Sequence, residues 1–136
     1  MATFSKFQSF VEAIAEKKHN LGSDTLTVAL TNSAPLATNG VLADITQIAY
    51  TYCSARVITI TSSAQTAGTY KLVLADLVLT ASGGAVGPFR YVVIYNDTAL
   101  NDELIGWYDY LSSITLNDTE TLTIDFDGTN GVLTLA

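Results

Sequence analysis

The spacing of apolar residues changes once along the chain, near Gly22, and this change separates a helical part from a β part. Between positions 3 and 20 the apolar residues recur every three or four positions, as on one face of an α-helix. They are Phe4, Phe7, Phe10, Val11 and Ile14. The pattern predicts one amphipathic helix over 3–20, with Thr3 as its N-cap and Gly22 as its stop.

After Gly22 the apolar residues alternate with polar ones, which is the period of a β-strand. The first such segment is 24–31, with Leu26, Val28 and Leu30 on its inner face. Further strand patterns cover 56–62, 69–80, 89–96, 104–110, 119–126 and 132–135. Glycine, proline, asparagine and aspartate separate these segments. The sequence therefore predicts a mainly β domain: an antiparallel β-sandwich of the jelly-roll kind, or a barrel, with one N-terminal helix.

Residues 32–54 interrupt the alternation. The segment contains Pro35, Asn39 and Gly40, and its apolar spacing is patchy, so we expect an irregular arm. Loops of this length are uncommon in compact domains and usually serve a purpose, such as exchange between subunits.

Two predicted strands are apolar on both faces, one beginning at Lys71 and the other at Tyr91. Such strands are either central and covered within the chain, or they face another molecule. Ala75 and Asp76, in the middle of the first, suggest a bulge.

The length of 136 residues predicts a single domain over 1–136. Only 14% of the residues are charged and the net charge is -7, so nucleic acid is not an expected partner. No apolar run approaches a membrane span and no secretion signal is visible, so we expect no membrane contact. The single cysteine, Cys53, forms no intramolecular disulfide, which is consistent with synthesis in a reducing compartment.

The chain lacks the residue sets that catalysis requires, and we expect neither an enzyme nor a cofactor. His19 is the only histidine and is predicted to be either solvated or a C-capping residue at the helix end. With Cys53 it could form a pair, but no third partner or oxyanion motif accompanies them. The carboxylates available as an acid and base pair lie mostly at turns and strand ends: Asp76, Asp97, Asp102, Glu103, Asp109 and Glu120.

One segment resembles a calcium loop, because Asp125, Asp127 and Asn130 place oxygen atoms close together before Gly131. It lacks the closing glutamate of an EF-hand and joins two predicted strands. A tight β-turn explains the same residues, so calcium is a secondary hypothesis and no metal is expected.

Aromatic residues are the candidates for an interface with another protein. On the helix, Phe4, Phe7 and Phe10 either dock on the sheet of the same chain or contact a neighbour. On the strands, Tyr91, Tyr95, Tyr108 and Tyr110 are interface candidates because tyrosine is enriched at such surfaces. Trp107 either packs in the core or stacks on a sugar.

Several stretches make the chain similar to a family of small structural proteins from tailed-bacteriophage particles, of the head-decoration or cement kind. They include TNSAP at 31–35, QTAGTYKL at 65–72, GPFRY at 87–91, YNDT at 95–98, IGW at 105–107 and TNGVL at 129–133. The similarity runs almost from end to end and is weakest over 50–54. It brings no functional residues with it.

The resemblance implies a structural role in which the chain binds the major capsid protein on the outer capsid surface and stabilises the head. It would be made in the host cytoplasm and act in the virion. Copies of the chain would bind as a small closed oligomer, for which we expect a homotrimer. The alternative is a protein of the tail, head-tail junction or fibre tip, where Trp107 could bind a host glycan.

Overall fold

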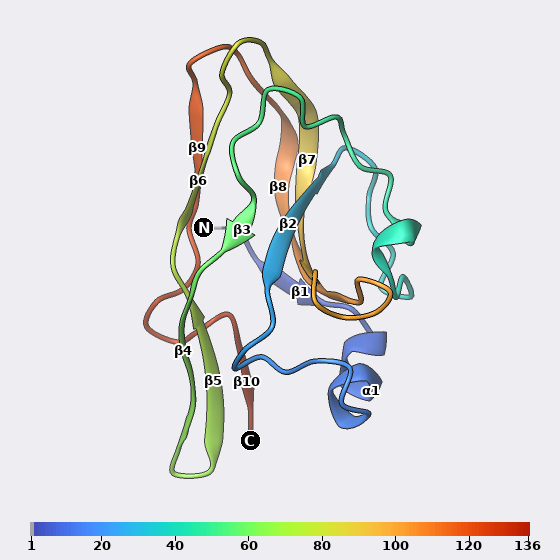
Figure 1. Ribbon diagram of the computed structural model, residues 1–136, viewed down its shortest axis with the longest axis vertical. Helices are drawn as coiled ribbons and strands as arrows, with labels where there is room; N and C mark the ends of the chain where they lie inside the picture. The colour runs from blue at the N-terminus through green and yellow to red at the C-terminus, as the bar shows by residue number, and fades with distance from the viewer. Residues whose placement is uncertain (1) are drawn as a thin grey trace.

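The computed structural model describes residues 2–136 as two antiparallel β layers with one short helix beside them (Figure 1). One layer is a five-stranded sheet in the order β1-β8-β7-β2-β3. Its strands are β1 (Phe4–Lys6), β2 (Leu26–Thr31), β3 (Val57–Ile58), β7 (Val86–Asn96) and β8 (Leu104–Leu116). The predicted mainly β, antiparallel, sandwich-like fold is thereby confirmed.

The second layer has two parts, which lie end to end along the left of Figure 1. A three-stranded sheet has the order β10-β5-β4, and a two-stranded sheet pairs β6 with β9. These strands are β4 (Ile60–Thr66), β5 (Thr69–Leu74), β6 (Leu77–Thr80), β9 (Thr121–Ile124) and β10 (Leu133–Leu135). The single strand expected over 69–80 is thus two strands. At the break the Asp76 carboxylate accepts a hydrogen bond from the Phe126 N–H over 2.9 Å.

The main core lies between the two layers, where the alternation of each strand places its apolar side chains. Leu26, Val28 and Leu30 of β2 point into it, as the sequence predicts. They meet Leu72 and Leu79 from the opposite layer.

A second cluster explains why the strand beginning at Tyr91 is apolar on both faces. On the outer face of the five-stranded sheet, Val93 and Tyr95 pack with Phe7 and Ile45. Ile45 belongs to the irregular arm, 32–54, which contains only a short 3-10 helix, η1 (Leu42–Asp44). Of the two explanations left open by the sequence, coverage within the chain is correct for this strand. The arm lies against its own sheet.

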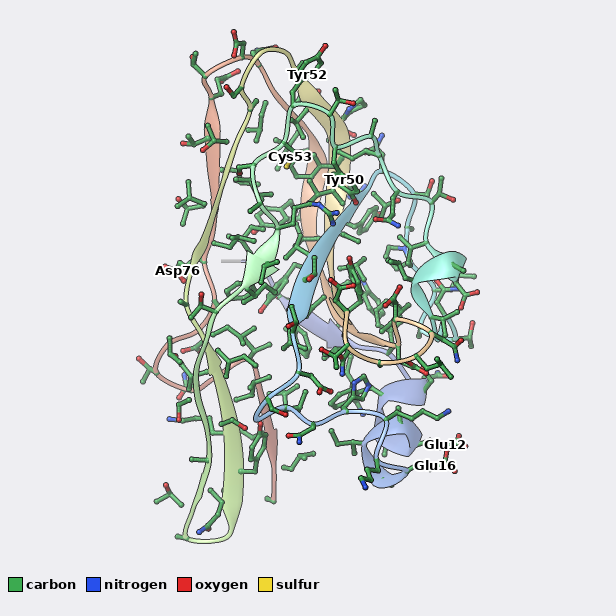
Figure 2. The ribbon with its side chains drawn as sticks, viewed as in Figure 1. Glu12, Glu16, Tyr50, Tyr52, Cys53 and Asp76 are labelled. Atoms are coloured by element: carbon green, nitrogen blue, oxygen red, sulfur yellow. The ribbon has the colours of Figure 1, made fainter. Side chains whose placement is uncertain are left out.

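The N-terminal helix is shorter than predicted. Helix α1 covers Ser9–Ala15, and Phe4–Lys6 form β1, paired antiparallel with β8. The prediction of a helix over 3–20 is wrong because helical spacing in a short segment cannot compete with the unpaired edge of β8. Thr3 is not its N-cap, and the chain leaves the helix at Lys17, whose φ is 66°. Figure 2 shows Glu12 and Glu16 on the outer side of α1.

The arm also completes the edge of β2, which pairs with β3 only at Leu26 and Thr27. Further along the strand, the Leu30 N–H donates to the Tyr50 hydroxyl over 2.9 Å, and the Ile48 N–H donates to the Leu30 carbonyl over 3.0 Å. Figure 2 shows Tyr50 beside the end of β2. The Arg56 guanidinium lies 3.6 Å from the centre of the Tyr50 ring. This edge is therefore satisfied within the chain.

Candidate interaction surfaces

Most aromatic side chains proposed as interface residues are buried in the chain itself. Tyr91, Tyr95 and Tyr108 are buried, and Tyr110 is half-buried against the main core. Burial raises the pKa of Tyr95, Tyr108 and Tyr110, because the charged form of the hydroxyl is poorly solvated there. Tyr91, Tyr95 and Tyr108 are therefore covered within the chain, whereas Tyr110 stays partly exposed and remains an interface candidate.

The three phenylalanines also pack within the chain. Phe7 is buried and its ring centre lies 4.5 Å from that of Trp107, while Phe10 is buried in the main core. Phe4 is half-buried and lies 5.5 Å from the Tyr108 ring. Docking on the same chain, one of the two expectations, is what the structure shows. Aromatic composition alone did not distinguish a core from an interface.

The loop resembling a calcium site is organised by its own hydrogen bonds. The Asp127 carboxylate accepts from the backbone N–H groups of Thr129 and Asn130, and the Asn130 side-chain amide donates to it over 3.0 Å. These bonds lower the pKa of Asp127, the Asn130 N–H having the largest effect. Asp125 takes no part in them. Among residues 2–136 no three acidic, histidine or cysteine side chains gather as a metal site would require.

His19 is buried, not solvated, and the prediction for it is wrong. It is 6% exposed, and its ring centre lies 5.2 Å from that of Phe10. The Asn96 Oδ1 accepts hydrogen bonds from the N–H groups of Thr98 and Ala99, which orients the amide. Its Nδ2 then donates to His19 Nδ1 over 3.0 Å and to Asp24 over 2.7 Å.

This network defines the tautomer of His19. Because Nδ1 accepts a hydrogen bond, Nε2 carries the proton of the neutral ring. Nε2 has no acceptor within residues 2–136. Burial lowers the pKa of His19, while the carboxylates of Glu103 and Asp24 oppose this and Lys18 adds to it. A neutral imidazole that already accepts at Nδ1 and is closed to solvent at Nε2 is poorly placed as a general base.

The structure does not bring Cys53 to His19. The imidazole bonds to Asn96, whereas Cys53 lies at the end of the arm in a bridge with Ala81. Burial raises the pKa of the Cys53 thiol, with a smaller opposing effect of Arg56. The protonated thiol is a weak nucleophile. The geometry therefore supports no Cys-His chemistry.

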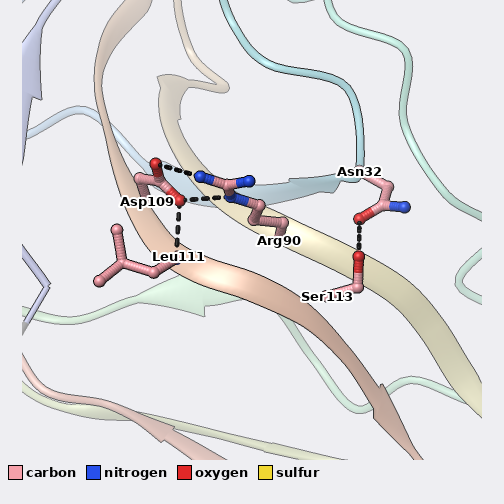
Figure 3. Close-up of polar contacts among 5 residues, drawn as sticks. All are labelled: Asn32, Arg90, Asp109, Leu111 and Ser113. Atoms are coloured by element: carbon pink, nitrogen blue, oxygen red, sulfur yellow. Dashed lines mark hydrogen bonds and ion pairs between the residues drawn. The ribbon is translucent and has the colours of Figure 1, made fainter.

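Arg90 and Asp109 hold an irregular part of β8 in place (Figure 3). The guanidinium donates two hydrogen bonds to the carboxylate, over 2.7 and 3.0 Å, and Asp109 also accepts from the Leu111 N–H over 2.7 Å. The pairing register between β7 and β8 shifts here, and Leu111 has a φ of 70°. Its side chain is 78% exposed. The register shift therefore presents an apolar side chain to solvent.

A second exposed region forms where the arm meets the turn between β7 and β8. We call residues 36–45 and 97–103 the arm-loop surface. Backbone hydrogen bonds hold its two segments together. The Leu42 N–H donates to the Asp102 carbonyl, and the N–H of Leu104, directly after the second segment, donates to the Gly40 carbonyl, each over 3.0 Å. A groove of about 460 Å³ lies between them, lined by Val41, Leu42, Ala43, Ile45, Gln47, Asn101 and Asp102.

The arm-loop surface is apolar at its tips and acidic elsewhere. Leu100 is 95% exposed and Leu36 is 62% exposed. The two segments contain Asp44, Asp97 and Asp102, and the buried Glu103, but neither lysine nor arginine. Desolvation raises the pKa of Asp102, and Asp97 and Glu103 add to the effect. The surface therefore suits a neutral or basic protein partner.

Sequence reasoning missed these leucines because single apolar residues in loops are common.

Comparisons with protein-family models, with curated proteins and with solved structures find no match to this chain. Within residues 2–136 no helix has the length and apolar character needed to cross a bilayer.

Proposed function

We propose that the chain is a virion structural protein of a tailed bacteriophage, a decoration or cement protein that binds the outer surface of the capsid. The partner is the major capsid protein, together with further copies of the chain. It is made in the host cytoplasm and acts without making or breaking a bond. Its stabilising effect on the head comes from a modest contact repeated over many copies.

The arm-loop surface is the contact that this proposal uses, and the exposure of Leu100 is the observation that carries it. A leucine that is 95% exposed contributes nothing to the core and becomes useful when a partner covers it. The arm and the loop are held together by backbone hydrogen bonds, so the surface is already ordered before binding. The low charge of the chain, of which 14% of the residues are charged, supports a surface that partners cover.

A reconstruction of the phage particle tests the proposal through the position and copy number of the chain. Hundreds of copies on the shell would support decoration. A dozen or fewer would support the alternative, a tail, junction or fibre-tip protein. The glycan-binding form of that alternative is not favoured, because the Trp107 ring packs against Phe7.

A variant pair tests the surface itself. Leu100→Ser should lower the occupancy of the chain on purified shells without changing its folding. Val78→Ser removes an apolar side chain that is 51% exposed on β6, in the other layer, and serves as the control. Equal occupancy for both variants would exclude the arm-loop surface as the contact.

A further inference from the structure

The edge of β4 is a regular strand edge without a strand partner in the part of the chain that the structure describes. Strand β4 pairs with β5 on one side, and no strand lies on its other side. The hairpin of β4 and β5 extends beyond the rest of the second layer (Figure 1). The edge of β2, in contrast, is completed by the arm and by Tyr50.

The register shows which backbone groups of β4 point outward. The Leu72 carbonyl accepts a hydrogen bond from the Val132 N–H over 2.8 Å, so Leu72 directs its backbone groups away from β4. Ser63 lies opposite Leu72 and therefore directs its own N–H and C=O to the free side. Gln65, two residues further along β4, also directs its N–H and C=O to the free side. Within residues 2–136, none of these outward groups has a backbone partner.

The usual protections of an edge strand are nearly absent from β4. Natural edges carry lysine, proline or bulges that prevent pairing with another chain. Residues 57–70 contain no charged residue and no proline. The register shift between Ile60 and Ser62 is a bulge, but it leaves Ser62 to Thr66 in regular pairing with β5.

We propose that two copies of the chain pair through their β4 edges, antiparallel and about a two-fold axis. In the register centred on Ala64, Ser63 of one copy lies opposite Gln65 of the other. In each such pair, the N–H of Ser63 donates to the C=O of Gln65 and the N–H of Gln65 donates to the C=O of Ser63. The two Ala64 residues face each other as a pair without hydrogen bonds, with Cα atoms about 4.5 Å apart. The result is one continuous sheet across the two copies.

A second copy is the partner that best fits this edge, for two reasons. A two-fold contact requires a surface complementary to itself, and an antiparallel pair of identical neutral strands satisfies that condition. The chain carries a net charge of -7, so copies approach most easily where neither is charged. The other free edge of the same sheet, β10, offers only three residues. A trimeric ring built from the free edges of this sheet would join β4 to β10 and therefore has the shorter contact.

The inference goes beyond the proposed function and does not depend on it. Pairing of purified chains is measured without any capsid, whereas decoration is measured on particles. A failure of one experiment therefore leaves the other informative. The two-fold contact makes a dimer, where the sequence led us to expect a trimer, and the test separates these assemblies.

Ser63→Pro with Ser63→Ala as its control tests the edge. Proline removes the outward N–H and breaks no backbone hydrogen bond within the chain, while both variants lose the contact of the Ser63 hydroxyl with Tyr70. Sedimentation should give twice the chain mass of 14.5 kDa for the wild type and for Ser63→Ala, and one chain mass for Ser63→Pro. Circular dichroism verifies that each variant is folded. If Ser63→Pro does not fold, Gln65→Pro removes the other outward N–H.

A disulfide tests the register. In a Cys53→Ser background, Ala64→Cys should form a disulfide-linked dimer on mild oxidation, because the expected Cα separation suits such a bond. Thr123→Cys, on an exposed part of β9, is the control and should remain mostly unlinked. A monomeric or trimeric wild type at 100 µM, a folded Ser63→Pro or Gln65→Pro dimer, or equal linking of both cysteines would overturn the proposal.

Discussion

The side-chain amide of Asn96 donates a hydrogen bond to Nδ1 of His19 over 3.0 Å, and so joins the segment after α1 to the end of β7. The same amide bonds to Asp24 and, through its oxygen, to Thr98 and Ala99. Asn96 is fully buried. A single side chain therefore connects residues 19–24 with the end of β7 and the turn that follows it. Its bond to His19 requires that Nδ1 of the ring carry no proton.

Stability should depend on the protonation of His19. Its pKa in the folded chain lies below the ordinary value of 6.5, so between these two values the unfolded chain binds more protons. The free energy of unfolding should therefore fall as the pH falls through 6.5 toward the folded pKa, and be insensitive to this group above that range. Urea unfolding between pH 5 and 8 measures the effect. His19→Gln should flatten the dependence, and an unchanged profile in that variant would show that other groups cause it.

Gly106 allows β1 to approach β8, so Gly106→Ala should destabilise the fold. A Cβ at this position would meet the Phe4 ring and lie 2.6 Å from the Ser5 carbonyl oxygen. Relief requires β1 to move, at an expected cost of about 1–3 kcal/mol in the free energy of unfolding. Gly128→Ala is the control, because a Cβ there meets nothing within 4 Å. Equal stability of the two variants would mean that β1 does not pack on β8.

Substitutions at Phe7 and at Leu100 should differ in their effect on the free energy of unfolding. Phe7 is fully buried under the arm, so Phe7→Ala should lower the free energy of unfolding by about 3–5 kcal/mol. Leu100→Ala should change it by no more than about 0.5 kcal/mol. Denaturant unfolding of both variants measures the difference. A small effect for Phe7→Ala would mean that Phe7 does not stabilise the core and would again make it an interface candidate.

Asp109 should matter more for stability than its partner Arg90. Removal of Arg90 breaks the ion pair, whereas removal of Asp109 also frees the Leu111 N–H at the register shift. The pKa of Asp109 is lowered by Arg90 first and by that N–H second, which shows that both donors act on the carboxylate. Calorimetry should give a lower melting temperature for Asp109→Ala than for Arg90→Ala. Equal melting temperatures would indicate that only the ion pair stabilises this part of β8, and a lower value for Arg90→Ala would contradict the prediction.

The sequence by itself determined the β character of the chain, the irregular arm, and which face of β2 points toward the core. These features depend on local alternation and on turn residues, which act over a few positions. The apolar character of both faces of the Tyr91 strand was also visible, and correctly indicated that something covers it. What covers it could not be predicted, because Ile45 reaches that face through a segment without periodicity.

Only the tertiary structure decided which aromatic side chains are buried and that residues 4–6 form a strand. Phe4 and Tyr108 are distant in sequence, and their contact exists because β1 pairs with the edge of β8. Helical spacing therefore placed Phe4 wrongly. The burial of His19 likewise depends on Asn96, a partner in a different strand. The free edge of β4 has the same origin, since an edge is defined by which strands fail to meet, a property of the whole sheet.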